Sequence, residues 1–193
     1  MPLHGRLTRL NPTRALFIEP RDETLSGRGN PSFLAVRQQN NDFTCSVTLT
    51  AQPKTTNCAA SLVAFQNEGH YFAINVKIDS GHLAEISLEQ SAGNRGFGRR
   101  GSGGGRGAEP KILANQKLPD GVTSIELRFE GAGPVSKCSY KTGDGEFTLL
   151  GQELQSSFLS TDTAGGFQGV TLGIFARLES ADSANSLPEN NNP

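Results

Sequence analysis

Several residue types and patterns are scarce in this chain of 193 residues. It has no tryptophan, one methionine and two tyrosines, and its formal net charge is −1. A chain this close to neutrality has no global field that would draw it to nucleic acid or to an anionic membrane, so we expect neither as a partner. No apolar stretch reaches the length of a membrane span, and the N-terminal residues lack the apolar run of a signal peptide. As written, the chain is expected to be cytoplasmic, or to be a fragment of a larger protein.

Cysteines and metal-ligand motifs are equally sparse. The three cysteines, Cys45, Cys58 and Cys138, are odd in number and irregularly spaced, which does not indicate a disulfide framework. We expect them to be small core residues, although a Cys45–Cys58 bridge between neighbouring strands stays open. The chain lacks the paired Cys and His spacings of a structural zinc site. No cofactor is expected. The aspartates are scattered and form no dense calcium-binding loop, but a single structural calcium assembled from distant loops stays open.

What the sequence does contain is alternation of apolar and polar side chains, the period of a half-buried β-strand. In 44–49 the odd-numbered residues are apolar and the even-numbered ones carry hydroxyl groups. Similar runs cover 60–65, 71–78, 82–89, 122–130, 136–141, 146–150 and 170–176. Turn-forming residues separate them, most clearly at 67–69, 79–81 and 142–145. In the run 82–89 we expect Ala84, Ile86 and Leu88 to point inward.

Composition supports the same fold class. The chain has 23 glycines and 10 prolines, and no amphipathic helix longer than two turns is evident. About eight to ten strands separated by turns are typical of an all-β protein with two packed antiparallel sheets. We expect one β-sandwich domain over residues 1–178 and a disordered polar tail over 179–193.

The segment 91–108 is rich in glycine, arginine and serine and is too polar to bury a core, so we expect a surface loop. It resembles the RGG segments that bind RNA by charge and stacking. It holds only four arginines in a chain that is not basic overall, and we therefore favour an ordinary expanded loop.

Two arrangements of residues are candidates for catalysis. Glu85, Ser87 and Glu89 share one strand face and resemble the Glu-x-Asp-x-Glu strand of laminarinase-type glycanases, but Ser87 replaces the middle carboxylate. We expect this face to be exposed, with solvated charges. A Ser-His-Asp triad lacks its Gly-x-Ser-x-Gly elbow, and the expectation for His70 and His82 is a surface or rim position.

Sugar recognition usually needs aromatic platforms beside planar hydrogen-bonding groups. The segment 65–71 is the best candidate, because it brings aromatic, amide, imidazole and phenol groups to one hairpin. The candidate carbohydrate-binding residues there are Phe65, Gln66, Asn67, His70 and Tyr71. An ordinary exposed hairpin is about as plausible from the sequence.

Three segments resemble the C-terminal domain of family-43 β-xylosidases. Residues 20–39 (PRDETLSGRGNPSFLAVRQQ) are similar to the opening of that domain, 64–72 to its Asn-Glu hairpin, and 166–176 to its Gly-Phe-x-Gly strand. The resemblance covers about residues 14–177. It implies a concanavalin A-like β-sandwich, or jelly roll, that in the family packs against a catalytic five-bladed propeller.

The resemblance further implies a non-catalytic accessory or carbohydrate-binding module, which in some members of the family binds xylan, while the catalytic carboxylates lie in the propeller domain. It adds Arg37 and Gln39, at the entry to a strand, to the candidate sugar-binding residues. The departures are also informative, because the propeller is absent from this sequence and one arginine of the family's Arg-Arg-Gln motif is replaced by Val36. Two alternatives stay open. One is a β-xylosidase or laminarinase-like enzyme that uses Glu85 and Glu89, and the other is a structural or interaction sandwich.

Overall fold

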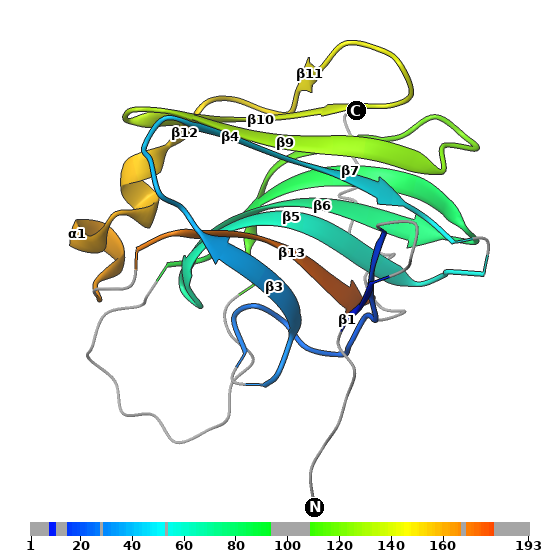
Figure 1. Cartoon of the computed structure of the whole chain (residues 1–193), viewed down its shortest axis with the longest axis horizontal. Coiled ribbons are helices and arrows are strands. Elements are labelled where there is room, and N and C mark those ends of the chain that lie inside the picture. The colour runs from blue at the N-terminus through cyan, green and yellow to red at the C-terminus, as the bar shows by residue number, and fades with distance from the viewer. Residues whose placement is uncertain are drawn as a thin grey trace, which may run out of the picture.

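The computed structural model describes residues 8–10, 15–27, 29–52, 54–93, 109–166 and 169–179. Two antiparallel sheets pack face to face (Figure 1). The larger sheet has six strands in the order β3 (Ser32–Arg37), β13 (Thr171–Leu178), β5 (Cys58–Asn67), β6 (His70–Asp79), β7 (His82–Gln90) and β8 (Lys111–Lys117). This arrangement confirms the predicted two-sheet antiparallel sandwich.

The second sheet has five strands. Its order is β11 (Thr148–Leu149), β10 (Val135–Lys141), β9 (Ser124–Ala132) and β4 (Phe43–Thr50), and β12 (Leu154–Gln155) also pairs with β10. A separate hairpin joins β1 (Thr8–Leu10) to β2 (Leu16–Ile18). Two short helices, η1 (Ser156–Leu159) and α1 (Thr161–Ala164), connect β12 to β13. No helix in the described part of the chain is long and apolar enough to cross a membrane.

The main core lies between the two sheets. Alternate residues of the central strands point into it, including Leu62, Ile74, Ile86, Leu127 and Phe129, all of which are fully buried. Burying aliphatic and aromatic side chains at this density is the main stabilising contribution to such a sandwich. All three cysteines are free; Cys58 and Cys138 are buried and Cys45 is half-buried, which agrees with the expectation of core residues.

The structure corrects several details of the strand predictions. Ala84 is exposed rather than inward, because the register between β6 and β7 shifts: Ile78 pairs with Leu83, and Lys77 pairs with Glu85. A bulge of this kind inserts one extra residue, so the side chains before it point to the opposite face from the one that simple alternation predicts. Leu83 is therefore buried in place of Ala84. The strand expected over 146–150 is only two residues long. The strands β3 and β8 were not predicted, since the six- and seven-residue sequences SFLAVR and KILANQK alternate poorly.

A second apolar cluster lies on the outer face of the six-stranded sheet. Leu25, Val63, Tyr71, Ala73 and Phe175 are buried together there. Leu25 comes from residues 15–27, which we call the N-terminal strap, and the strap is tied to the sheet where Arg21 O accepts a hydrogen bond from Leu178 N. The outer face of this sheet is therefore partly covered. The predictions for most of the 91–108 loop and for the tail after Glu179 lie outside the described residues.

Candidate functional site

The register of the six-stranded sheet brings three of the predicted sugar-binding residues into one row. Thr171 of β13 pairs with Arg37 of β3 on one side and with Phe65 of β5 on the other, and Phe65 pairs with Tyr71 of β6. The side chain of Thr171 strengthens the row by donating a hydrogen bond to Phe65 O (3.1 Å). We call Arg37, Thr171, Phe65 and Tyr71 the outer-face row.

Aromatic rings cluster in this row. Phe65 stacks near Tyr71 with 6.2 Å between ring centroids, and Phe33 tilts against Phe65 at 5.3 Å. Arg37 is exposed, Phe33 and Phe65 are half-buried, and Tyr71 is buried beneath them. The row thus offers a partly accessible aromatic surface beside a guanidinium group. These are the two kinds of group that sugar recognition requires.

Tyr71 is held from both sides. Its hydroxyl lies 3.0 Å from Ser26 Oγ of the strap, and its backbone N–H donates to Ser91 Oγ (2.8 Å). Burial raises the pKa of the Tyr71 phenol, and the hydrogen bond between Tyr71 and Ser26 only partly offsets that effect. Tyr71 therefore stays neutral and supports the platform from below rather than presenting a free hydroxyl.

The remaining hairpin residues face the short helices. Asn67 Nδ2 donates to Ala164 O of α1 (3.0 Å), and Asn67 Oδ1 accepts from Gly69 N (3.0 Å) and lies 3.1 Å from His70 Nδ1. The His70 ring packs on Phe158 of η1 with centroids 4.9 Å apart. His70 is therefore buried, and its expected surface or rim position is wrong. Burial also lowers the pKa of His70.

Gln66 and Gln39 complete the predicted set. Gln66 is the extra residue where the β5–β6 register shifts, and it is buried with its Oε1 lacking a hydrogen-bond partner. Gln39 lies in the loop 38–42 between β3 and β4 and is exposed. The structure therefore divides the candidates into the outer-face row, the pair Asn67 and His70 that faces α1 and η1, the buried bulge residue Gln66, and the loop residue Gln39. Their role in sugar binding stays a prediction.

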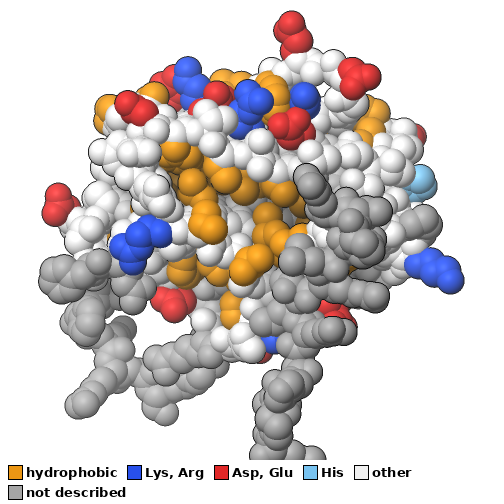
Figure 2. Space-filling view, in the orientation of Figure 1, with side chains coloured by type: hydrophobic (Ala, Val, Ile, Leu, Met, Phe, Trp, Pro, Cys, Tyr) orange, Lys and Arg blue, Asp and Glu red, His pale blue; other side chains and the backbone are white. Residues whose placement is uncertain are grey.

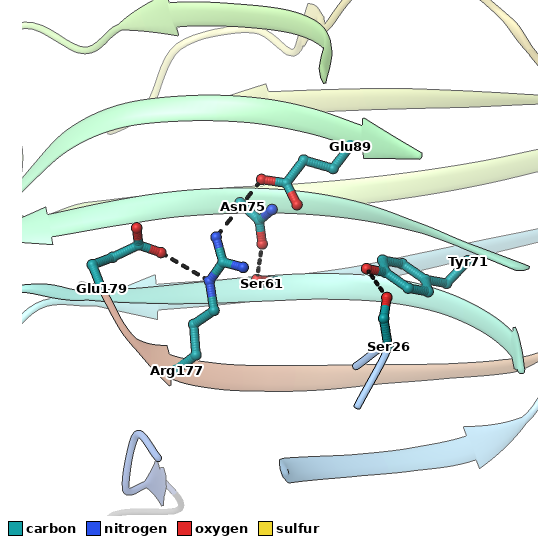
Figure 3. Close-up of polar contacts among 7 residues, drawn as sticks. All are labelled: Ser26, Ser61, Tyr71, Asn75, Glu89, Arg177 and Glu179. Atoms are coloured by element: carbon teal, nitrogen blue, oxygen red, sulfur yellow. Dashed lines mark hydrogen bonds and ion pairs between the residues drawn. The ribbon is translucent and has the colours of Figure 1, made fainter. Parts of the chain in front are cut away.

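The acidic face of β7 differs from the expectation in one important residue. Glu89 is only 6% exposed, whereas an exposed, solvated carboxylate was expected. Its Oε1 lies 3.9 Å from Arg177 Nη2, and Arg177 Nε donates to Glu179 Oε1 at 2.8 Å (Figure 3). Asn75, which accepts a hydrogen bond from Ser61, lies beside the same carboxylate. We call Glu89, Arg177, Glu179, Asn75 and Ser61 the polar cluster.

Desolvation dominates the electrostatics of this cluster. Burial raises the pKa of Glu89, and the opposing effects of Arg177, Asn75 and Ser87 do not cancel it. Glu85 is half-exposed and pairs across the sheet with Lys77 and Lys117, so the two carboxylates lie in different surroundings. Within the described ranges, no group of three or more His, Cys, Asp or Glu side chains is placed to hold a metal ion.

Sequence reasoning missed three residues of this face. Phe33 belongs to a strand that was not predicted, and its aromatic character was the available signal. Asn75 and Arg177 are polar residues at outward-facing positions of strands whose core-facing residues are apolar, so both fall on the face opposite the core. A polar residue at an outward-facing position of such a strand was the available signal that the sheet has a second, polar face.

Comparison with known proteins agrees with this architecture. The family model described as "Beta xylosidase C-terminal Concanavalin A-like domain" matches residues 2–186. A xylosidase/arabinosidase of Butyrivibrio fibrisolvens is 27% identical over 171 residues, which are 88% of this chain and 29% of that protein.

Solved structures share the fold. A GH43_12 protein retrieved from a capybara gut metagenome superposes with a TM-score of 0.73 at 24% identity, covering 89% of this chain and 30% of that one. A xylan β-1,4-xylosidase from Bacillus halodurans C-125 gives a TM-score of 0.66 at 18% identity, covering 84% and 29%. The chain thus spans less than a third of the length of these proteins. It belongs to the family of β-xylosidase C-terminal concanavalin A-like domains.

Proposed function

We propose that this chain is a non-catalytic accessory module for xylan or arabinoxylan breakdown, and that it contacts the polysaccharide through the outer-face row. The observation that carries this proposal is the register that places exposed Arg37 and half-buried Phe65 on either side of Thr171 in one row, with Phe33 packed against Phe65. A guanidinium group can donate several hydrogen bonds to sugar hydroxyls, while an aromatic face packs against the apolar side of a pyranose ring.

The carboxylates support a non-catalytic role. A glycosidase needs an acid and a nucleophile or base that both reach the scissile bond from a cleft. Glu89 is buried, and its carboxylate faces Arg177 and Asn75 within the polar cluster. Its surroundings suit a structural carboxylate of the sheet, so hydrolysis by the family's longer members is proposed to reside in a catalytic domain acting with this module.

Affinity electrophoresis in gels containing soluble arabinoxylan tests the binding proposal. The unmodified chain is expected to be retarded, and Arg37→Ala and Phe65→Ala are each expected to weaken the affinity about fivefold, since each removes one contact of roughly 1 kcal/mol. Phe147→Ala is the matched control, because Phe147 is also a half-buried aromatic residue but packs against the other sheet. Its ring centroid lies 3.4 Å from Cζ of Arg128 in β9.

The outcomes separate the three readings of the sequence. Equal retardation of all variants, or none for the unmodified chain, would remove the outer-face row as a sugar site and favour a structural or interaction sandwich. Because Phe65 also packs in the second cluster, its variant is compared with the exposed Arg37→Ala at equal folded fraction. Turnover of a nitrophenyl xyloside that Glu89→Gln or Glu85→Gln abolishes would instead establish the enzyme alternative.

A further inference from the structure

An apolar floor is exposed along one edge of the sandwich. Leu34 and Val36 of β3 pair with Ile174 and Leu172 of β13, and Leu172 belongs to the main core, so both side chains point toward the other sheet. They are nevertheless 48% and 70% exposed. Leu178 has the same orientation, because it pairs with buried Cys58, and it is 46% exposed. Strand β3 therefore extends beyond the edge of the facing sheet, and the apolar side chains on its inner face are left uncovered.

The opposite side of this opening is the edge of β4. Its inward residues Cys45, Val47 and Leu49 are only half-buried, and they pack against the core. Figure 2 shows apolar side chains gathered in a hollow, and Figure 1, in the same orientation, places β3 and β4 along its two sides. We call this hollow the β3–β4 groove. The loop 38–42, which joins the two strands, closes one end of it.

The edge of β4 can accept another strand. Within the described ranges β4 pairs only with β9, so its other edge has no strand partner. The eight residues of β4 keep a continuous register with β9 and contain no proline, lysine or bulge, the features that usually protect an edge. A long unprotected edge above an apolar floor is the geometry of strand addition, in which backbone hydrogen bonds give affinity and alternate side chains give specificity.

Two other occupants fit less well. A second copy that paired edge to edge through β4 would be related to the first by a two-fold axis. The protruding β3 of that second copy would then lie across the inner face of β13 of the first copy, where Leu172 is already packed. Residues 179–193 carry aliphatic side chains only at Ala181, Ala184 and Leu187, three residues apart. A strand that covers Leu34 and Val36 needs apolar side chains at every second position.

We propose that the β3–β4 groove binds an extended segment of another polypeptide, which adds to β4 as a strand and covers Leu34 and Val36. The partner segment is uncharged at its centre and has β-branched or aromatic side chains at alternate positions, because the described floor residues Leu34, Val36 and Leu178 are all apolar. This surface is separate from the outer-face row, which lies on the opposite face of the six-stranded sheet. The inference therefore does not depend on sugar binding.

A labelled peptide that alternates valine and threonine over the length of β4 is the probe. Fluorescence anisotropy is expected to show saturable binding to the full chain, and a peptide with a central proline is expected to bind about tenfold more weakly because it loses ladder hydrogen bonds. Val36→Asp is expected to weaken binding about tenfold or more, since it would bury a carboxylate without a partner. Ile112→Asp is the matched control, because Ile112 is also an exposed aliphatic residue (50%, against 70% for Val36) and lies on the opposite edge strand β8, where no effect is expected.

Each result decides the proposal. Binding that depends on Val36 but not on Ile112, together with slower amide exchange in β4, supports it. Absence of saturable binding, or equal loss in both variants, overturns it. A chain shortened after Glu179 that binds the peptide when the full chain does not would show that the chain's own tail is the occupant, and it would also overturn the proposal. The folded state of both variants is checked by circular dichroism, and each substituted side chain is at least half exposed.

Discussion

At the scale of single residues, Glu89 is the only Asp or Glu that is buried in the described structure. A buried carboxylate is costly unless it is paired, and its partner Arg177 lies 3.9 Å away, at the limit of an ion pair. The guanidinium of Arg177 is also shared with Glu179 at 2.8 Å. Glu89 is thus only partly compensated, which is why desolvation raises its pKa.

This raised pKa predicts a pH dependence of stability. A carboxyl whose pKa is higher in the folded state binds more protons folded than unfolded, so its contribution is fully present below the unfolded pKa and is lost as pH rises through the folded pKa. The free energy of unfolding is therefore expected to fall as pH rises from about 4 through that range. Glu89→Gln, which stays neutral, should flatten this slope in urea titrations at several pH values.

Glu85→Gln provides the control, because Glu85 lies on the same strand but is half-exposed. Its profile should run parallel to that of the unmodified chain. If the free energy of unfolding of Glu89→Gln instead varied with pH in parallel with that of the unmodified chain, the Glu89 carboxylate would be as well solvated in the folded state as an exposed one. Protonation of the polar cluster would then not be coupled to folding.

At the scale of strands, close packing between β3 and β13 depends on Gly173. A Cβ added there would lie 2.5 Å from Ala35 Cβ and from Leu34 O, so a backbone must move to admit it. Gly173→Ala is expected to lower the free energy of unfolding by about 1–3 kcal/mol, the usual cost of overpacking. Gly145→Ala is the matched control, since its nearest contact would be Thr142 O at an ordinary 3.4 Å. Equal denaturation midpoints for the two variants would show that β3 moves aside freely.

The sequence predicts the orientation of a side chain in these strands only where that orientation depends on local alternation. Val47 and Leu127 lie in strands with one buried and one wet face, so alternation identified them correctly. The position of Ala84 could not be predicted, because the bulge depends on how β6 and β7 pair rather than on local composition. His70 was misplaced for a similar reason, as its burial comes from Phe158, which lies 88 positions later in the chain. The outer-face row likewise exists only through the register of four strands.

At the scale of the whole molecule, the structure has two apolar clusters of unequal size. The main core joins both sheets, whereas the outer cluster joins the six-stranded sheet to the N-terminal strap through Leu25 and a few contacts. A small cluster closed by hydrogen bonds to Tyr71 and Leu178, and by one from Ser32 of β3 to Glu19 O, should open more easily than the sandwich does. Opening of the strap would uncover Tyr71, so the strap is expected to control access to that part of the outer-face row.

Leu25→Ala tests whether the strap is such an independent unit. Leu25 is 5% exposed, and truncating a buried leucine costs about 2–5 kcal/mol. If the strap opens independently, this loss is expected to appear as faster hydrogen exchange at the Leu178 amide, which bonds to Arg21 O, with little change at Leu62 or Ile74 of the main core. The same variant should bind arabinoxylan at least as well as the unmodified chain if the strap restricts the outer-face row. Equal acceleration at Leu178 and Leu62 would show instead that the strap unfolds only with the whole sandwich, and that it is a fixed part of the site rather than a cover.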